Sequence, residues 1–244
     1  RQPFGGWKRS AYGPGSKAGG PLYVASLCRM ENDPAADLTS HLSKAALAAH
    51  EGVHGKDPEA AHFALSLAEF EKPVDPSALK SEANVYRRLP LNKAIPDATP
   101  YLRLSAGANS EECYRALKVI LAMRHVWVVS VDPSHDPYLI ERVAEVAGFC
   151  EVQPEDEFAE MIQPHARVRV VGRVGPVLRE ACRVHGIPLF NGPVTNCPRL
   201  EFHPYYLEQA LSVTRHRHGN PLPDPRDPVV RAGWDRAGLL SGGA

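Results

Sequence analysis

The sequence predicts an α/β fold: a small Rossmann-like parallel sheet of about four strands with flanking helices. A glycine-rich loop and a helical arm precede this sheet, and a β-flap strand follows it. Strand-length apolar runs alternate with helix-length segments between residues 81 and 220, as in a parallel sheet with right-handed crossovers. The run 125–131 is dense in valine, which is typical of a strand buried on both faces.

Strands and helices of the predicted sheet alternate along the chain. We expect strands at 101–105, 125–131, 167–171 and 187–190. We expect helices at 109–124, 137–147, 155–162 and 176–185. In the first of these helices Cys113, Leu117 and Ile120 share one face, which can therefore pack on the sheet. A period-two pattern in 210–218 predicts the β-flap strand, and a turn signal follows it.

Composition divides the chain into four parts. They are the glycine-rich segment 1–30, the helical connecting arm and linker 31–80, the α/β unit with its β-flap 81–220, and the proline-rich tail 221–244. The glycine density of the first part indicates a loop whose backbone adopts positive φ or approaches another group closely. The arm carries two helix-compatible patterns, at 35–49 and 58–69. The prolines of the tail forbid regular structure.

Charge and hydropathy exclude several classes of protein. Lysine plus arginine total 28 and aspartate plus glutamate total 28, so no large basic field favours nucleic acid. No apolar run reaches the length of a membrane span and no signal segment opens the chain, so we expect a cytoplasmic protein. The chain starts at Arg1 and its earliest methionine is Met30, which indicates a piece of a longer protein.

The cysteines and histidines do not follow a recognisable metal or catalytic pattern. Five scattered cysteines without a C-x-x-C pair favour reduced, mostly buried thiols over a disulfide or zinc framework. Cys197 lacks the surroundings expected of a catalytic nucleophile. His216 and His218 share a strand face, for which a metal site and an interface are the alternatives. Arg215 and Arg217 on the opposite face favour an interface with acidic groups of another domain or subunit.

The strongest motif lies in the glycine-rich segment. Its two blocks are Gln2-Pro3-Phe4-Gly5-Gly6 and Gly15-Ser16-Lys17-Ala18-Gly19-Gly20-Pro21-Leu22-Tyr23. Together they resemble the end of the catalytic domain in aldehyde dehydrogenases of the 1-pyrroline-5-carboxylate dehydrogenase branch, which includes the fused proline utilization A enzymes. The resemblance implies that backbone N–H groups of Gly19 and Gly20, with Ala18 alongside, bind the α-carboxylate of the substrate. It also implies that Phe4 supports this site, and the alternative is a glycine-rich connector without a ligand.

The segment between the two blocks departs from that family. Many relatives carry a small Ser-Gly-Thr-Gly stretch before the lysine, whereas residues 9–14 read Arg-Ser-Ala-Tyr-Gly-Pro in this sequence. The bulkier side chains change the expected shape of the loop and leave the following glycines in place.

A second resemblance covers residues 81–220. The segments 82–87 and 207–220, with the α/β unit between them, are similar to the extra C-terminal domain of longer proline utilization A proteins. The similarity implies a noncatalytic domain, resembling half of an aldehyde dehydrogenase domain, whose β-flap packs over the catalytic domain.

Both resemblances imply a part in the NAD-dependent oxidation of L-glutamate γ-semialdehyde to glutamate, in proline catabolism. The family's catalytic cysteine, its glutamate and its NAD fingerprint are absent from this sequence, so we expect the fragment alone to be inactive. NAD is expected to bind to the missing upstream part, and FAD only if a proline dehydrogenase domain is fused upstream. The expected partners are a small-molecule substrate, the upstream catalytic domain of the same chain and further copies in a homo-oligomer, but no nucleic acid.

Two alternative functions come from the α/β unit itself. The arginine-rich flap is also typical of a structural or oligomerisation module without a ligand. The other alternative is an independent nucleotide-binding protein, although the turn at 105–112 has one glycine and lacks the G-x-G-x-x-G pattern. Asn109 and Glu112 are better explained as a capping box, and the glycines at 172 and 175 as a tight turn into a helix.

Overall fold

The computed structural model describes residues 3–7, 10–33, 36–38, 40, 42–54, 56–79, 82–123 and 128–214. The predicted interface residues Arg215 and Arg217 and the predicted tail 221–244 lie outside the described residues. Within the ranges given, no helix combines the length and the apolar character needed to cross a membrane.

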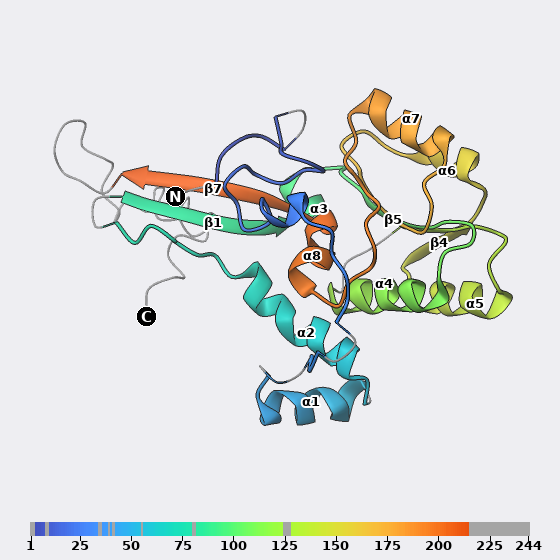
Figure 1. Cartoon of the computed structure of the whole chain (residues 1–244), viewed down its shortest axis with the longest axis horizontal. Helices are drawn as coiled ribbons and strands as arrows, with labels where there is room; N and C mark the ends of the chain where they lie inside the picture. The colour runs from blue at the N-terminus through green and yellow to red at the C-terminus, as the bar shows by residue number, and fades with distance from the viewer. Residues whose placement is uncertain are drawn as a thin grey trace.

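A five-stranded parallel sheet forms the α/β unit (Figure 1). In spatial order its strands are β4 (Phe149–Val152), β3 (Val128–Val131), β2 (Pro100–Leu104), β5 (Arg167–Val171) and β6 (Leu189–Phe190). The predicted α/β class and Rossmann-like sheet are therefore confirmed, with one strand more than the expected four. The additional strand is β4, at the edge of the sheet, where Phe149 and Val152 are exposed. A half-exposed edge strand lacks the long apolar run by which buried parallel strands are detected.

Helices cover both faces of this sheet (Figure 1). The helices α4 (Ser110–Met123) and α5 (Pro137–Val146) lie on one face, and α6 (Glu155–Met161) and α7 (Pro176–His185) lie on the other. Successive side chains of a strand point to opposite faces. Leu102 and Leu104 of β2 therefore share a core with α4, whereas Tyr101 packs edge to face on Phe158 of α6. These four helices start and end within one residue of their predicted bounds.

The predicted arm contains two helices, α1 (Lys44–His54) and α2 (Pro58–Glu71). The first starts later than predicted, and the hydroxyl of Ser43 accepts the N–H of Ala46 at 3.1 Å, as an N-cap does. The second starts where predicted, because Asp57 accepts the N–H groups of Glu59 and Ala60 at 3.0 Å.

The helix α2 packs in the same hydrophobic core as the sheet. Phe63 and Phe70 are buried, and each ring meets the ring of Phe202 edge to face, at 6.1 and 5.2 Å between centroids. Phe202 is the last residue of α8 (Pro198–Phe202), which the 3-10 turn η2 (His203–Tyr205) follows directly. The arm is thus joined to the α/β unit by aromatic packing, in addition to the chain connection.

A two-stranded antiparallel ribbon extends beside the sheet (Figure 1). It consists of β1 (Glu82–Pro90), followed by the short α3 (Leu91–Ala94), and β7 (Tyr206–Thr214). The strands pair from Glu82↔Thr214 to Pro90↔Tyr206. The predicted flap strand lies in β7, which starts at Tyr206 instead of residue 210. Burial is complete at the Tyr206 end and decreases toward Thr214.

Candidate functional site: the glycine-rich loop and its supports

The glycine-rich loop (residues 3–7 and 10–23) is folded back on itself by main-chain hydrogen bonds. The N–H of Phe4 donates to the carbonyl of Ala18 at 3.0 Å. Tyr12 and Ser16 exchange two hydrogen bonds, at 2.8 and 3.0 Å. Because Phe4 and Ala18 come from the two predicted motif blocks, this folding brings both blocks together.

Three consecutive loop residues, Gly15, Ser16 and Lys17, are hydrogen-bonded to side chains of the α/β unit and the ribbon. Arg167 of β5 supports the first of them, Gly15. Its side chain is buried and donates to the carbonyl of Gly15 at 3.1 Å. It also donates to the carbonyl of His203 at 3.2 Å and to that of Tyr206. Gly15 has a φ of +96°, and a Cβ there would lie 2.8 Å from the guanidinium, so the fold requires glycine at this position. Burial lowers the pKa of Arg167 to about 10, although the charge of Glu208 opposes this shift.

His203 of η2 supports the second loop residue. Its Nε2 and the hydroxyl of Ser16 are hydrogen-bonded at 2.9 Å, and both residues are buried. Burial, together with the charges of Arg167 and Arg88, holds the pKa of His203 well below its usual range. The imidazole is therefore neutral in the folded protein near neutral pH.

Glu208 of β7 supports the third loop residue. One carboxylate oxygen accepts the N–H of Lys17 at 2.9 Å, and the other accepts the hydroxyl of Tyr86 of β1. Burial and the charge of Glu208 raise the pKa of Tyr86, which keeps this hydroxyl protonated as a donor. The buried carboxylate thus joins the loop to both strands of the ribbon.

The main-chain N–H of Gly20, one of the predicted anion-binding glycines, has a partner within the loop. It donates to the carbonyl of Lys17 at 3.0 Å, as in a turn. A Cβ on Gly20 would lie 2.9 Å from the same carbonyl, which explains the glycine by packing alone. The role predicted for Gly19, Gly20 and Ala18 in binding the substrate stays a prediction, and Gly19 adopts a φ of +69°.

A small cavity lies beside the two predicted substrate-binding glycines. Its volume is about 220 Å³, and it is lined by Pro3, Gly19, Gly20, Pro21, Val74, Pro76 and Tyr86. The ring of Phe4 approaches Gly19, because a Cβ there would lie 3.9 Å from Phe4 Cε1. Phe4 itself is 69% exposed, so most of its ring is available to another surface.

The switch point of the sheet is closed by the protein itself. This is the place, between β2 and β5, where a doubly wound sheet usually binds a dinucleotide. A Cβ on Gly172, directly after β5, would lie 2.8 Å from the Cβ of Ala108, so the loops that follow these two strands are in close contact. The loops that follow β2 and β5 therefore touch each other at this edge of the sheet.

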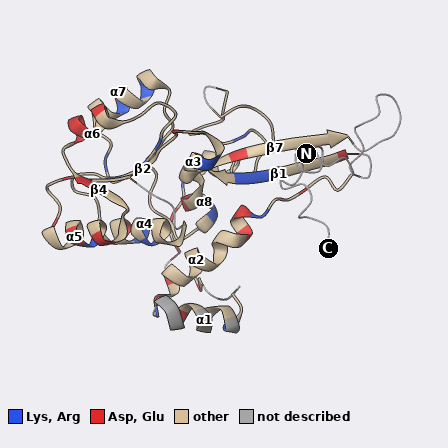
Figure 2. Ribbon diagram, turned by 180° about the vertical axis from the view of Figure 1, so that it is seen from behind, with Lys and Arg blue, Asp and Glu red and all other residues tan. Residues whose placement is uncertain are grey.

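Side chains of the protein also occupy the helix N-termini that would bind a phosphate. At α7, the carboxylate of Glu155 accepts the N–H groups of Gly175 at 2.7 Å and Leu178 at 3.3 Å. Acidic residues open α6 as well (Figure 2). The N-terminus of α7 therefore already has a carboxylate of the protein as its partner.

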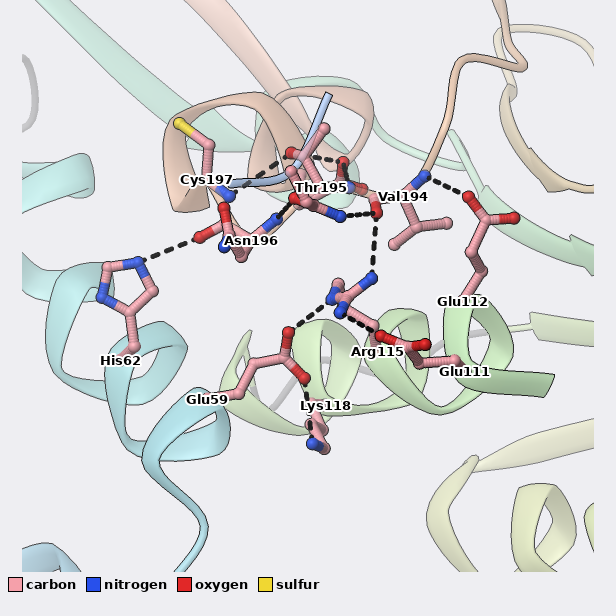
Figure 3. A network of polar contacts seen from close by, with 12 residues as sticks. Glu59, His62, Glu111, Glu112, Arg115, Lys118, Val194, Thr195, Asn196 and Cys197 are labelled. Carbon is pink, nitrogen blue, oxygen red and sulfur yellow. Dashed lines mark hydrogen bonds and ion pairs between the residues drawn. The ribbon is translucent and has the colours of Figure 1, made fainter. Parts of the chain in front are cut away.

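One half of the capping box predicted at the start of α4 is confirmed. The side-chain oxygen of Asn109 accepts the N–H groups of Glu111 at 2.8 Å and Glu112 at 3.3 Å. The carboxylate of Glu112 accepts the N–H of Val194 at 3.0 Å (Figure 3). Arg115, one turn later, donates to the carbonyl of Val194 and binds Glu59 of α2 (Figure 3). This network joins α2, α4 and the segment before α8.

The five cysteines are free thiols. Cys113 and Cys182 are buried, and burial raises the pKa of their thiols to about 12 and about 11. Thiols with such pKa values are not nucleophiles at neutral pH. The prediction of mostly buried cysteines holds for these two, whereas Cys28 is exposed and Cys150 and Cys197 are half-buried.

A solved structure with a related fold connects the chain to a known protein. No protein-family model matches the sequence, and no curated protein shows a significant match. The chain is similar to proline utilization A from Corynebacterium freiburgense, with a TM-score of 0.57 and 28% sequence identity. This likeness supports a proline utilization A-like relationship. The match covers 88% of this chain and 19% of that one, so the chain spans less than a fifth of the protein it resembles.

The residues that support the glycine-rich loop are identified by the structure and not by the likeness to proline utilization A. No sequence pattern predicted Arg167, His203 and Glu208 as a group, since they come from β5, η2 and β7. One signal could have found the first of them: β5 reads Arg-Val-Arg-Val-Val and is buried throughout. Arginine is almost never fully buried unless its charge and its donors have partners. Two arginines in one buried strand therefore indicate that polar main-chain groups reach into the core beside it.

Proposed function

We propose that the chain is the C-terminal part of an NAD-dependent dehydrogenase that oxidises L-glutamate γ-semialdehyde to glutamate in proline catabolism. In this proposal the chain supplies the glycine-rich loop and a noncatalytic α/β cap (residues 81–220). The reactive cysteine and the NAD site belong to an upstream catalytic domain of the same protein, and FAD only to a fused proline dehydrogenase domain. The observation that carries the proposal is the likeness to proline utilization A over 88% of the chain.

The arrangement of the cap supports this division of roles. Three buried side chains of the cap bind three consecutive residues of the loop, immediately before the predicted substrate-binding positions 18–20. A loop fixed in this way can present main-chain groups to a small anion at low entropic cost. The closed switch point supports a cap that binds no cofactor of its own.

Enzyme kinetics with the protein that includes the upstream domain test the proposal. Gly19→Ala is expected to raise KM for the semialdehyde by about tenfold or more, because a hydrogen bond to a charged group is lost or misplaced. KM for NAD should not change. Gly107→Ala is the matched control, since Gly107 has a φ of +66°, close to the +69° of Gly19, and lies in the cap. Equal effects of both substitutions on KM for the semialdehyde would contradict the assignment of Gly19 to substrate binding.

A second candidate function, assembly through the ribbon, has its own supporting observation. An isolated two-stranded ribbon is at best marginally stable in water. Leu211 and Val213 near its outer end are only half-buried, so a partner surface would stabilise it. Because Glu208 binds the loop, deleting 207–220 would disturb more than assembly, and Val213→Asp is the sharper variant. A smaller oligomer in analytical ultracentrifugation would favour this candidate, and an unchanged mass would count against it.

The third candidate, independent nucleotide binding, is disfavoured by the occupied helix N-termini. Titration of the chain with NAD or FAD, followed by calorimetry, is expected to give no saturable signal. Saturable binding would restore this candidate.

A further inference from the structure

An asparagine–glycine step lies in the segment between β6 and α8. Asn191 and Gly192 form the one place in the 244 residues where glycine follows asparagine. Asparagine is thermally labile, because the main-chain nitrogen of the next residue attacks its side-chain amide. Glycine has no Cβ and the widest choice of backbone conformations, so it hinders this attack least. This step is therefore where such a reaction is expected first.

The fold leaves both reacting groups of this step accessible. Asn191 and Gly192 are exposed, and a Cβ built on Gly192 would have no atom within 4 Å apart from its neighbours in the chain. Neither the side-chain amide of Asn191 nor the main-chain N–H of Gly192 is hydrogen-bonded to any residue that the structure describes. No hydrogen bond therefore has to break before the nitrogen of Gly192 approaches Cγ of Asn191.

Two other asparagines show the contrast. The side-chain amide of Asn32 donates to the carbonyl of Val194 at 3.0 Å and accepts the N–H of Asn196 at 2.7 Å. Asn196 is followed by Cys197, whose N–H donates to the hydroxyl of Thr195 at 3.3 Å (Figure 3). In each case a group that the reaction needs already has a partner.

We propose that Asn191 is a site of spontaneous deamidation in the folded chain, with isoaspartate among the products. The main-chain nitrogen of Gly192 gives up its proton and forms a bond to Cγ of Asn191. The bond from Cγ to Nδ2 breaks, and ammonia leaves with that proton. Water then opens the cyclic imide at one of its two carbonyls, which leaves aspartate or isoaspartate at position 191. The inference does not depend on the proposed function.

Isoaspartate at this position would disturb a buried cation. Arg169 is 4% exposed and donates to the carbonyls of Phe190 at 3.3 Å and Gly192 at 2.7 Å, on either side of Asn191. Isoaspartate routes the main chain through Cγ, which adds one carbon atom to the path between these two carbonyls. The guanidinium then loses the present geometry of at least one acceptor, and a buried charge without its acceptors destabilises the fold. Ordinary aspartate leaves the main chain unchanged.

Incubation of the full 244-residue chain at mildly alkaline pH, followed by mass spectrometry of tryptic peptides, tests the inference. Cleavage after Arg183 and Arg199 yields one peptide that holds both Asn191 and Asn196, so Asn196 is an internal control. We expect deamidation at Asn191 and none measurable at Asn196 over the same period. Gly192→Ala should slow the reaction severalfold, and the fold tolerates it, since Gly192 has no positive φ and its Cβ meets open space.

The same incubation in urea shows whether the fold itself permits the reaction. An Asn191 that deamidates in urea but stays intact in the folded chain would overturn the inference. Equal rates at Asn191 and Asn196 in the folded chain would overturn it as well.

The isoaspartate form, separated by chromatography, tests the consequence for Arg169. Its midpoint of urea denaturation should be lower than that of the unmodified chain. Asn191→Asp is the matched control, because it has the same charge and an ordinary main chain, and it should unfold with the unmodified chain. Equal midpoints for all three proteins would contradict the disturbance of Arg169.

Discussion

The carboxylate of Glu208 accepts the main-chain N–H of Lys17 at 2.9 Å, which joins two residues 191 positions apart in the sequence. The same carboxylate accepts the hydroxyl of Tyr86. Its charge also acts on buried Arg167, which donates to Gly15. The conformation of the glycine-rich loop therefore depends on charges inside the cap.

Removing the charge of Glu208 should destabilise the chain strongly. Glu208→Gln leaves the buried guanidinium of Arg167 without this compensation, and we expect the free energy of unfolding to fall by roughly 3 kcal/mol. Urea denaturation measures the change, and faster proteolysis within residues 10–23 should accompany it. Glu180→Gln, at the exposed pair of Glu180 and Arg183, is the control and should have no measurable effect. Equal stability of both variants would contradict the support assigned to Glu208.

The requirement for glycine at position 15 can be measured against another glycine of positive φ. Gly15→Ala should cost roughly 3 kcal/mol, because strain of the backbone adds to a collision with Arg167. Gly107→Ala should cost about 1 kcal/mol, since its Cβ would meet nothing within 4 Å. Thermal unfolding of the two variants gives the comparison. A smaller loss for Gly15→Ala than for Gly107→Ala would show that the loop does not approach Arg167.

Stability should fall on mild acidification because of His203. Its pKa is well below 6.5 in the folded chain and near 6.5 when unfolded, so below pH 6.5 the unfolded state binds one proton more. The free energy of unfolding should then decrease as the pH falls, with a slope of about 0.7 kcal/mol per pH unit at pH 6.5 that approaches about 1.4 kcal/mol per pH unit one unit lower. Denaturation between pH 7.0 and 5.5 should show this decrease, and His203→Gln should lack the contribution of this histidine. The same slope in both proteins would contradict a neutral, buried His203.

The ion pair between α2 and α4 should contribute more than a surface pair. Glu59 and Arg115 are 15% and 12% exposed, and they lie in the network of Figure 3. A double-mutant cycle with Glu59→Gln and Arg115→Met should give a coupling of about 1 to 2 kcal/mol. The control pair, Arg142 and Glu145, is about half exposed and should give less than about 0.5 kcal/mol. Equal couplings would contradict the larger contribution assigned to the pair of Glu59 and Arg115.

Local patterns allowed much of the fold to be predicted, and distant contacts account for the rest. The bounds of α4 to α7 follow from periodicity and from caps such as Asn109, which act within a few residues. The strand β1 was not predicted, because it exists by pairing with β7 far along the chain, Glu82 with Thr214. The candidate site was likewise predictable only in its local part. Its glycines could be identified by motif, but Arg167, His203 and Glu208 contact the loop from 152 to 191 positions away.

The most direct test of the central proposal is NADH formation from L-glutamate γ-semialdehyde, followed by absorbance. Two proteins are compared: the 244-residue chain and the same chain extended by its upstream catalytic domain. We expect no NADH from the chain alone and steady NADH formation from the extended protein. NADH formation by the chain alone, or none by a folded extended protein, would contradict the proposal.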